Sequence, residues 1–323
     1  MKKDLSMKKL LKVDYIAVIV ALILEVAIFG ILSPYFFTMN NLLTILQYCA
    51  LTGLVALPYT LLMISGNFDM SMGSQVALVS CVVATICHDN TIGWGTVLLS
   101  ILAAMIIGGI CGYLNSVFIL KVGLPPFIAT MAMMQALRGV AYLLTNGSSI
   151  MVTSKVFGIL GRKKTFGIPN TVYILVVFII IFAFIAKYTV FGRRAYTIGG
   201  NKTAARLSGI NVHRNVTILY IINSAMCGLV GMLYTSQLGA AIPSSNANFA
   251  FDVISAVVLG GCAMDGGKGT MAGTIMGVLI LAILDNGLIM LNVSSHWQLV
   301  CSGVVLLIAV SIDSLKQKRI DKK

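Results

Sequence analysis

The sequence predicts an all-α, polytopic integral membrane protein with about ten transmembrane helices, inverted repeats and short broken helices. Its 323 residues are 58% hydrophobic and only 10% charged, which is too few charges to cover the surface of a soluble protein. Apolar runs such as YIAVIVALILEVAIFGIL (15–32) and VYILVVFIIIFAFIA (172–186) are long enough, or nearly so, to cross a hydrocarbon core about 30 Å thick. Short motifs also recur in the same order in two parts of the chain.

The apolar runs place one transmembrane domain at 15–315, between tails at 1–14 and 316–323. Run 251–263 is short for a full crossing, so we expect a broken or tilted helix there. Segment 66–74 (GNFDMSMGS) is too polar and glycine-rich to face lipid, and should be buried or line a cavity. The expected crossings are 15–32, 42–65, 71–88, 95–119, 126–145, 171–190, 216–238, 251–263, 270–291 and 297–313.

Basic residues are concentrated in three short segments. The N-terminal tail, the stretch 192–214 and the C-terminal tail each hold five of the 23 lysines and arginines. This is the pattern of cytoplasmic segments in membrane proteins, so we expect both termini and the middle loop to be cytoplasmic. The net charge of +13 is thereby explained by orientation in a cell membrane, and nucleic acid is not an expected partner.

The recurring motifs indicate an inverted-topology repeat, with copies at about 42–145 and 216–313. The first copy starts on a span that runs inward and the second on a span that runs outward, which is the layout of many transporters. The matching pairs are GLVALPYT (53–60) with GLVGMLYT (228–235), Phe68-Asp69 with Phe251-Asp252, GWGT (93–96) with GKGT (267–270), and Asn115 with Asn286.

Charged residues inside apolar spans are costly, so each should face protein, water or a helix end. Asp69 and Asp252 hold matching repeat positions, each opening a helix-like run; they are either helix caps or groups that line a solute path, and both roles can hold. Asp285 and Asn286 are expected to bond across helices, and Glu25 to pair with a neighbour. The candidate path residues are Asn67, Asp69, Asn115, Asp252 and Asn286.

No catalytic, cofactor or metal site is expected. The three histidines have no carboxylate or cysteine at useful spacing, and the seven cysteines are typical small core side chains. GGCAMDGGKGT (260–270) lacks the spacing of a phosphate-binding loop and is interpreted as a tight turn. Two ridges of small residues, Gly108/Gly112 and Gly269/Gly273/Gly277, predict close helix packing.

The stretch GRRAYTIGGNKTAARLSGINVHR (192–214) is polar and helix-like. Thr203 is a possible N-cap, Ala204, Ala205 and Leu207 form a small apolar face, and Gly209 is a natural stop. Helices that lie on lipid carry larger apolar faces. The pattern therefore favours docking against a groove of another protein, with a plain basic linker as the alternative.

Several segments resemble the membrane permeases of ATP-binding-cassette importers, in the branch that handles ribose, xylose, other simple sugars and related solutes. The resemblance covers about 38–315. The matching pieces are TMNNLLTILQ (38–47), SGNFDMSMGSQVAL (65–78), LPPFIATMAMMQALRGVAYLLTNG (124–147), GRRAYTIGGNKTAARLSGINV (192–212) and FDVISAVVLGGCAMDGGKGTMAGTIMGVLILAILDNGLIMLNVSSHWQ (251–298). The chain departs from the family pattern at Ser65-Gly66-Asn67 and Asp-Met-Ser-Met (69–72), changes that could alter the solute.

The resemblance implies a transport subunit in a multi-pass cell membrane protein, with ATP hydrolysis on a separate cytoplasmic subunit. It implies a second permease copy, identical or not, and a periplasmic or extracellular solute-binding protein. The stretch 192–214 would be the coupling loop on the ATPase. Its contact residues would be Gly200, Asn201, Ala204, Ala205, Leu207, Ser208 and Gly209.

The sequence thus predicts import of a monosaccharide such as ribose. Alternatives are a nucleoside, a furanone signal or a branched-chain amino acid, or a stand-alone ion-coupled carrier that uses Asp69 and Asp252 as proton sites. The loop 146–170 is basic although span parity places it outside. We interpret Arg162, Lys163 and Lys164 as a docking site for acidic edges of the binding protein; an exposed, solvated loop is the alternative.

Overall fold

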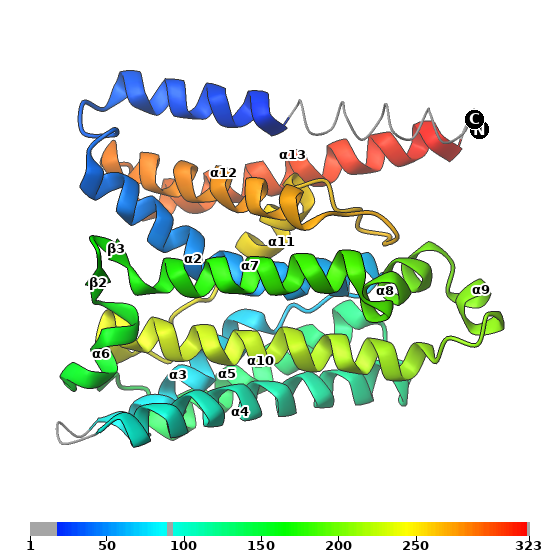
Figure 1. Ribbon diagram of the computed structural model, residues 1–323, viewed down its shortest axis with the longest axis horizontal. Coiled ribbons are helices and arrows are strands. Elements are labelled where there is room, and N and C mark those ends of the chain that lie inside the picture. The colour runs from blue at the N-terminus through cyan, green and yellow to red at the C-terminus, as the bar shows by residue number, and fades with distance from the viewer. Residues whose placement is uncertain (1–17, 89–92, 322–323) are drawn as a thin grey trace.

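The computed structural model describes residues 18–88 and 93–321, and it is a helical bundle with two very short pairs of antiparallel strands (Figure 1). The first half contains a helix at Val18–Leu32, α2 (Met39–Ile64), α3 (Met72–Cys87), α4 (Trp94–Leu120), α5 (Pro126–Thr145), β1 (Ile150–Met151), α6 (Lys155–Gly161), β2 (Lys164–Thr165) and β3 (Ile168–Pro169). The second contains α7 (Asn170–Tyr188), α8 (Val190–Gly200), α9 (Lys202–Leu207), α10 (Val212–Leu238), β4 (Ala240–Ala241), α11 (Phe249–Leu259), α12 (Met271–Met290) and α13 (Ser295–Asp321).

Each of the ten predicted crossings falls on an apolar helix. In the described part of the chain, six helices are long and apolar enough to span a membrane: α2, α4, α5, α7, α10 and α12. Four shorter apolar helices account for the rest: Val18–Leu32, Met72–Cys87, Phe249–Leu259 and Ser295–Ser311. Run 251–263, expected to be a broken or tilted helix, contains α11, which has only 11 residues.

The two predicted tails differ in outcome. The N-terminal tail, 1–14, lies outside the described residues, as do Lys322 and Lys323. The segment 316–321 is not an irregular tail, because α13 continues as a helix to Asp321. Its sequence, KQKRID, is rich in lysine, glutamine and arginine, which are good helix formers.

The core is centred on α2 and α10. In α10, 72% of the most apolar window is buried inside the chain, compared with 17% in α7. Helix α4 packs on α10 where a Cβ at Gly108 or Gly112 would lie 2.2 and 2.3 Å from backbone oxygens of α10. On α12, Gly277 is equally close to the backbone of Ala256 in α11, and Gly273 to that of Gly260, the C-cap of α11. Both ridges therefore pack helices closely, as predicted, except that Gly269 lies in the turn before α12, with φ +153°.

The long helices α2 and α10 run in opposite directions (Figure 1). Early in α2, Gln47 Nε2 donates to the carbonyl of Gly161 in α6, whereas late in α10 Ser236 Oγ donates to Phe157 of α6. Helix α2 packs on α11 and α12, and α10 packs on α3 and α4. Thus α2, from the first half of the chain, packs among helices of the second half, and α10, from the second half, packs among helices of the first. Such an exchange is expected of inverted-topology repeats.

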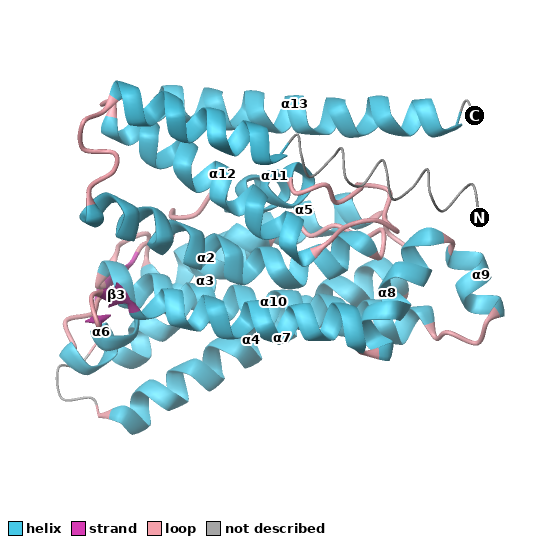
Figure 2. Ribbon diagram, turned by 45° about the horizontal axis from the view of Figure 1, so that its top comes forward, coloured by secondary structure: helices cyan, strands magenta, loops and turns pink. Residues whose placement is uncertain are grey.

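The bundle has two distinct ends. Figures 1 and 2 show α8, α9 and the C-terminal end of α13 at one end, here called the α9 end. Helix α6 and the strands β2 and β3 lie at the opposite end, here called the α6 end. The strands are confined to the α6 end, where β1 pairs with β4 and β2 with β3. The basic stretch 192–214 and the basic loop around 162–164 are therefore separated by the length of the bundle.

Candidate translocation and coupling sites

The carboxylate of Asp69 is the centre of a buried polar network between α2 and α3. Its Oδ1 accepts from the backbone N–H of Ser71 at 2.9 Å and from Asn115 Nδ2 of α4 at 3.4 Å. Its Oδ2 accepts from Gln75 Nε2 of α3 at 3.2 Å and from Asn223 Nδ2 of α10 at 3.1 Å. All five residues are fully buried. The irregular segment before α3 thus binds α3, α4 and α10 together through one side chain.

Asp69 lies two residues ahead of the N-cap of α3. The N-cap of α3 is Ser71, and Asp69 accepts from the N–H of that residue rather than from the first turn of the helix. The amide oxygens of Asn67, Gln75, Asn115 and Asn223 are buried without a partner among the described residues. Buried polar atoms are normally satisfied by protein or water. These acceptors mark a polar interior rather than a plain helix cap.

Asp252 does not match Asp69 structurally, although the repeat pairs them. It lies in the first turn of α11 instead of ahead of it, and α11 has no side-chain cap. Asp285 and Asn286 were expected to bond across helices, but within the described residues neither does, and Asn286 Oδ1 has no partner. The candidate path residues therefore form two groups. Asn67, Asp69 and Asn115 lie before α3 and on α4, and Asp252 and Asn286 lie on α11 and α12.

Glu25 does not pair with a neighbour, contrary to expectation. Its Oε2 is buried and has no hydrogen-bond partner in the described part of the chain. It lines a largely apolar hollow of about 310 Å³ between the helix Val18–Leu32, α12 and α13. An acid in this setting avoids the cost of an isolated charge by staying protonated or by meeting water.

A second irregular segment, IPSSNAN at 242–248, carries polar groups that sequence reasoning missed. Arg138 of α5 donates from one guanidinium nitrogen to the carbonyls of Pro243 and Ser245, at 2.6 Å each. Ser244 and Asn248 are exposed, and so is Gln135 on the facing helix α5. The sequence does contain a signal for this segment, because the polar run 242–248 lies between two apolar spans just as 66–74 does.

The two irregular segments meet at the starts of α3 and α11. A Cβ at Gly73 would lie 2.2 Å from the carbonyl oxygen of Asn246 and 3.5 Å from Phe249 Cβ. From this contact, the 16 residues of α3 extend about 24 Å toward the α6 end, and α11 extends about 16 Å toward the α9 end. The contact therefore lies well inside the bundle. Irregular backbone at such a depth is found where it is buried or lines a water-filled cavity.

Helices α8 and α9 form a polar elbow at the α9 end. Asn201, and not Thr203, is the N-cap of α9: its side chain accepts from Ala204 N at 2.9 Å. Gly209, at φ +77°, ends the elbow as predicted. Ala205 is fully buried within the chain and so is not available to a partner, whereas the side chain of Leu207 is 85% exposed. The apolar surface expected here is thus smaller than predicted and is dominated by Leu207.

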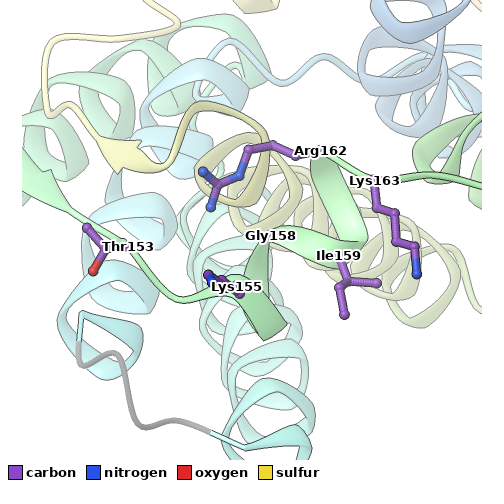
Figure 3. A pocket seen from close by; sticks show the side chains of 6 residues that line it. All are labelled: Thr153, Lys155, Gly158, Ile159, Arg162 and Lys163. Atoms are coloured by element: carbon purple, nitrogen blue, oxygen red, sulfur yellow. The ribbon is translucent and has the colours of Figure 1, made fainter.

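The basic loop at the α6 end forms a shallow hollow of about 330 Å³ (Figure 3). Lys155, Arg162 and Lys163 line it, with Thr153, Gly158 and Ile159, and Arg162 and Lys163 point in different directions around it. Lys164 is exposed but lies on β2 and not in the hollow. Lys155, which the sequence reasoning did not select, takes its place.

Comparisons with known proteins agree with this architecture. Residues 41–310 match the family described as branched-chain amino acid transport system / permease component. The chain is 37% identical to the ribose import permease protein RbsC of Escherichia coli (strain K12) over 303 residues, or 93% of each chain. It is 38% identical to the protein of that name in Bacillus subtilis (strain 168), over 91% of each chain.

A xylose transport system permease protein, XylH of Escherichia coli (strain K12), is 32% identical over 87% of this chain and 86% of its own. No solved structure matches the chain. A family match over most of the sequence, together with several apolar helices of spanning length, settles the class of protein. The chain belongs to this family of transport-system permeases and is a multi-pass membrane protein.

Proposed function

We propose that this chain is the permease subunit of an ATP-driven importer and that it forms the path for a monosaccharide such as ribose. The observation that carries the proposal is the meeting of two irregular polar segments inside an apolar bundle, around Asp69 and around 242–248. The relatives named as ribose and xylose permeases support a sugar as the solute. Amide and hydroxyl groups both donate and accept hydrogen bonds, as the hydroxyl groups of a sugar do.

The path is proposed to include Asn67, Asp69, Asn115, Asp252 and Asn286. Asn67, Asp69 and Asn115 are buried within one copy, so they support the path from behind and meet solute only when the halves move. The exposed side chains of Gln135, Ser244 and Asn248 are the part of the polar surface that a single copy leaves open. A lipid-facing glutamine is costly, so a second permease copy is expected to enclose this surface.

The α9 end is proposed to be cytoplasmic, with both chain termini on that side. A separate ATPase subunit would dock on the elbow through Gly200, Asn201, Ala204, Leu207, Ser208 and Gly209. The α6 end would then face outward, where a solute-binding protein would meet Lys155, Arg162 and Lys163. Closure of the ATPases would move the elbow and change the side to which the path is open.

The experiment is to purify the chain with its bound proteins and measure ATP turnover in lipid with candidate binding proteins and sugars. An importer permease brings down an ATPase, and ribose with its binding protein raises the turnover. A purified chain that accumulates solute without nucleotide, driven by an ion gradient, would instead be a stand-alone carrier. Stimulation by a nucleoside, a furanone or a branched-chain amino acid, and not by a sugar, would replace the proposed solute.

Leu207→Ala tests the docking surface directly. Burial of a leucine in a partner contributes about 1.5–3 kcal/mol, so we expect the variant to capture the ATPase about tenfold more weakly. Its own stability should not change, because the side chain is 85% exposed. Leu307→Ala on α13, where the leucine is 68% exposed, is the matched control. Equal capture by both variants would remove Leu207 from the interface.

A further inference from the structure

Helix α8 touches the end of α2 and the turn 260–270 through backbone atoms. A Cβ at Gly199 would lie 1.8 Å from the carbonyl oxygen of Ile64 and 2.6 Å from the amide nitrogen of Gly267. Gly267 N itself donates to Ile64 O at 2.7 Å. One turn earlier on α8, Tyr196 Oη donates to the carbonyl of Gly269 at 2.9 Å. Three chain segments thus meet here with no side chain between Gly199 and the other two.

The segments that meet at Gly199 are directly connected to the two short helices α3 and α11. Ile64 is the last residue of α2, and five residues later the chain reaches Asp69 and then α3. The turn 260–270 joins α11 to α12. The turn is held in shape by its own bonds, since Ala263 N donates to Lys268 O at 3.1 Å. A displacement of the turn would therefore be passed on to α11.

The same helix continues into the elbow. Asn201 ends α8 in an extended conformation and caps α9, so only one residue separates the two helices. Gly192, early in α8, packs against backbone oxygens of Ile185 and Ala186, so α8 is also held to the end of α7. Force applied to α9 would consequently reach Gly199 through only two residues, Asn201 and Gly200.

We infer that Gly199 and Tyr196 form a transmission junction, with Ile64, Gly267 and Gly269, that passes motion of the elbow to both short helices. This rests on the proposed function, because it presumes an ATPase that moves the elbow. The physical reason is stiffness: closely packed interiors have low compressibility and transmit displacement. A backbone contact also has no flexible side chain that could absorb a shift of a few tenths of an ångström.

The inference assigns a role to residues that docking alone does not need. Gly199 and Tyr196 are both partly buried, and neither belongs to the proposed ATPase contact. It also explains why the glycine-rich turn 260–270 has positive φ at Gly266 and Gly267, +89° and +74°. Glycine adopts these angles without steric cost, which lets the turn approach Gly199 and Ile64 closely.

The test uses the intact complex in lipid and measures solute moved per ATP hydrolysed. Gly199→Ala wedges a methyl group into the junction, and Tyr196→Phe removes one hydrogen bond without adding volume. Both should bind the ATPase as the wild type does and retain basal ATP turnover. We expect solute moved per ATP to fall about tenfold for Gly199→Ala, within the usual range of coupling between sites, and to fall measurably for Tyr196→Phe.

Two control variants test whether any change on α8, or any glycine-to-alanine change, lowers coupling. Thr197→Ala changes the exposed face of the same helix, and Gly303→Ala makes the same glycine-to-alanine change on α13 where no atom lies within 4 Å of the new Cβ. Both should couple normally. Unchanged coupling in Tyr196→Phe, or loss of ATPase binding in either junction variant, would overturn the inference. Failure of the wild-type complex to bind or stimulate an ATPase would instead overturn the proposed function.

Discussion

At Asp69, one carboxylate accepts hydrogen bonds from the segment ahead of α3 and from side chains of α3, α4 and α10. Gln75 Nε2 and Asn115 Nδ2 also donate to Ser71 Oγ, at 2.7 and 2.9 Å. This cross-bonding fixes the start of α3 relative to α10. The carboxylate therefore has a structural role whether or not solute ever reaches it.

Asp69→Asn should destabilise the folded protein by about 1–3 kcal/mol, because an amide NH₂ would face the donors that the carboxylate now satisfies. Thermal unfolding of the detergent-purified chain measures this. Asp252→Asn is the control, since Asp252 makes no side-chain hydrogen bond in the described structure and should change stability little. If both substitutions lower the unfolding temperature equally, the Asp69 network is not a stabilising feature.

The sequence could locate individual residues but not their partners. Asn67, Asp69 and Asn115 were selected because polar groups are costly in apolar spans. All three are buried, and the structure joins Asn115 to Asp69. Gln75 and Asn223 were not selected, since Asn223 meets Asp69 across 154 residues of chain and no local pattern reveals that contact. The carbonyls of Pro243 and Ser245 that bind Arg138 belong to a segment with no periodic signal, so no pattern in the sequence reveals that contact either.

At the scale of elements, the close approach of α4 and α10 depends on the absence of side chains at Gly108 and Gly112 of α4. At Gly108, any Cβ would collide with the backbone oxygen of Ser224 at 2.2 Å. At the next residue, Gly109, the nearest atom would be 3.6 Å away, an ordinary contact with Ile221. Two neighbouring glycines on one helix therefore differ sharply in how much they matter.

Gly108→Ala is expected to cost about 1–3 kcal/mol, because added volume in a packed contact forces the backbones apart. Gly109→Ala should be neutral or slightly stabilising, since alanine favours the helix. Comparing the yield of folded protein and the unfolding temperature of the two variants gives the answer. A Gly109→Ala variant as unstable as Gly108→Ala would show that the close contact of Gly108 with Ser224 is not what makes alanine costly on α4.

The sequence predicted which helices exist more reliably than it predicted where each helix begins and ends. Apolar runs long enough to cross a membrane predicted every long helix, and the polarity of 66–74 predicted that this segment avoids lipid by being buried or by lining a cavity. The N-cap of α9 was misplaced at Thr203 because Asn201 and Thr203 are both good capping residues, and only the extended backbone at Asn201 (φ −162°, ψ 107°) decides between them. Ala205 was placed on the exposed face because a six-residue helix has too few positions to define one.

For the whole molecule, basic side chains gather at both ends of the bundle, in the stretch 192–214 at the α9 end and in the loop around 162–164 at the α6 end. The α6 end carries Lys155, Arg162 and Lys163 around a shallow hollow. Charge reversal of Arg162 and Lys163 to glutamate should slow association with an acidic solute-binding protein and reverse its dependence on ionic strength, because salt then screens repulsion instead of attraction. Stopped-flow association rates at two salt concentrations measure this, with Lys187→Glu as a control of equal charge type. Unchanged rates and salt dependence would leave the hollow a solvated surface.

Orientation in the membrane is the property on which the two partner assignments jointly depend. Single cysteines at Lys163 and Lys202 place one thiol at each end of the bundle. The native cysteines of the described chain are buried, apart from the partly buried Cys301, so Cys301→Ser gives a low background. In intact cells, a membrane-impermeant maleimide should label Lys163→Cys and spare Lys202→Cys until the membrane is made permeable. The reverse pattern would place α9 outside, beyond reach of any ATPase, because the hydrocarbon core admits neither a folded subunit nor its nucleotide.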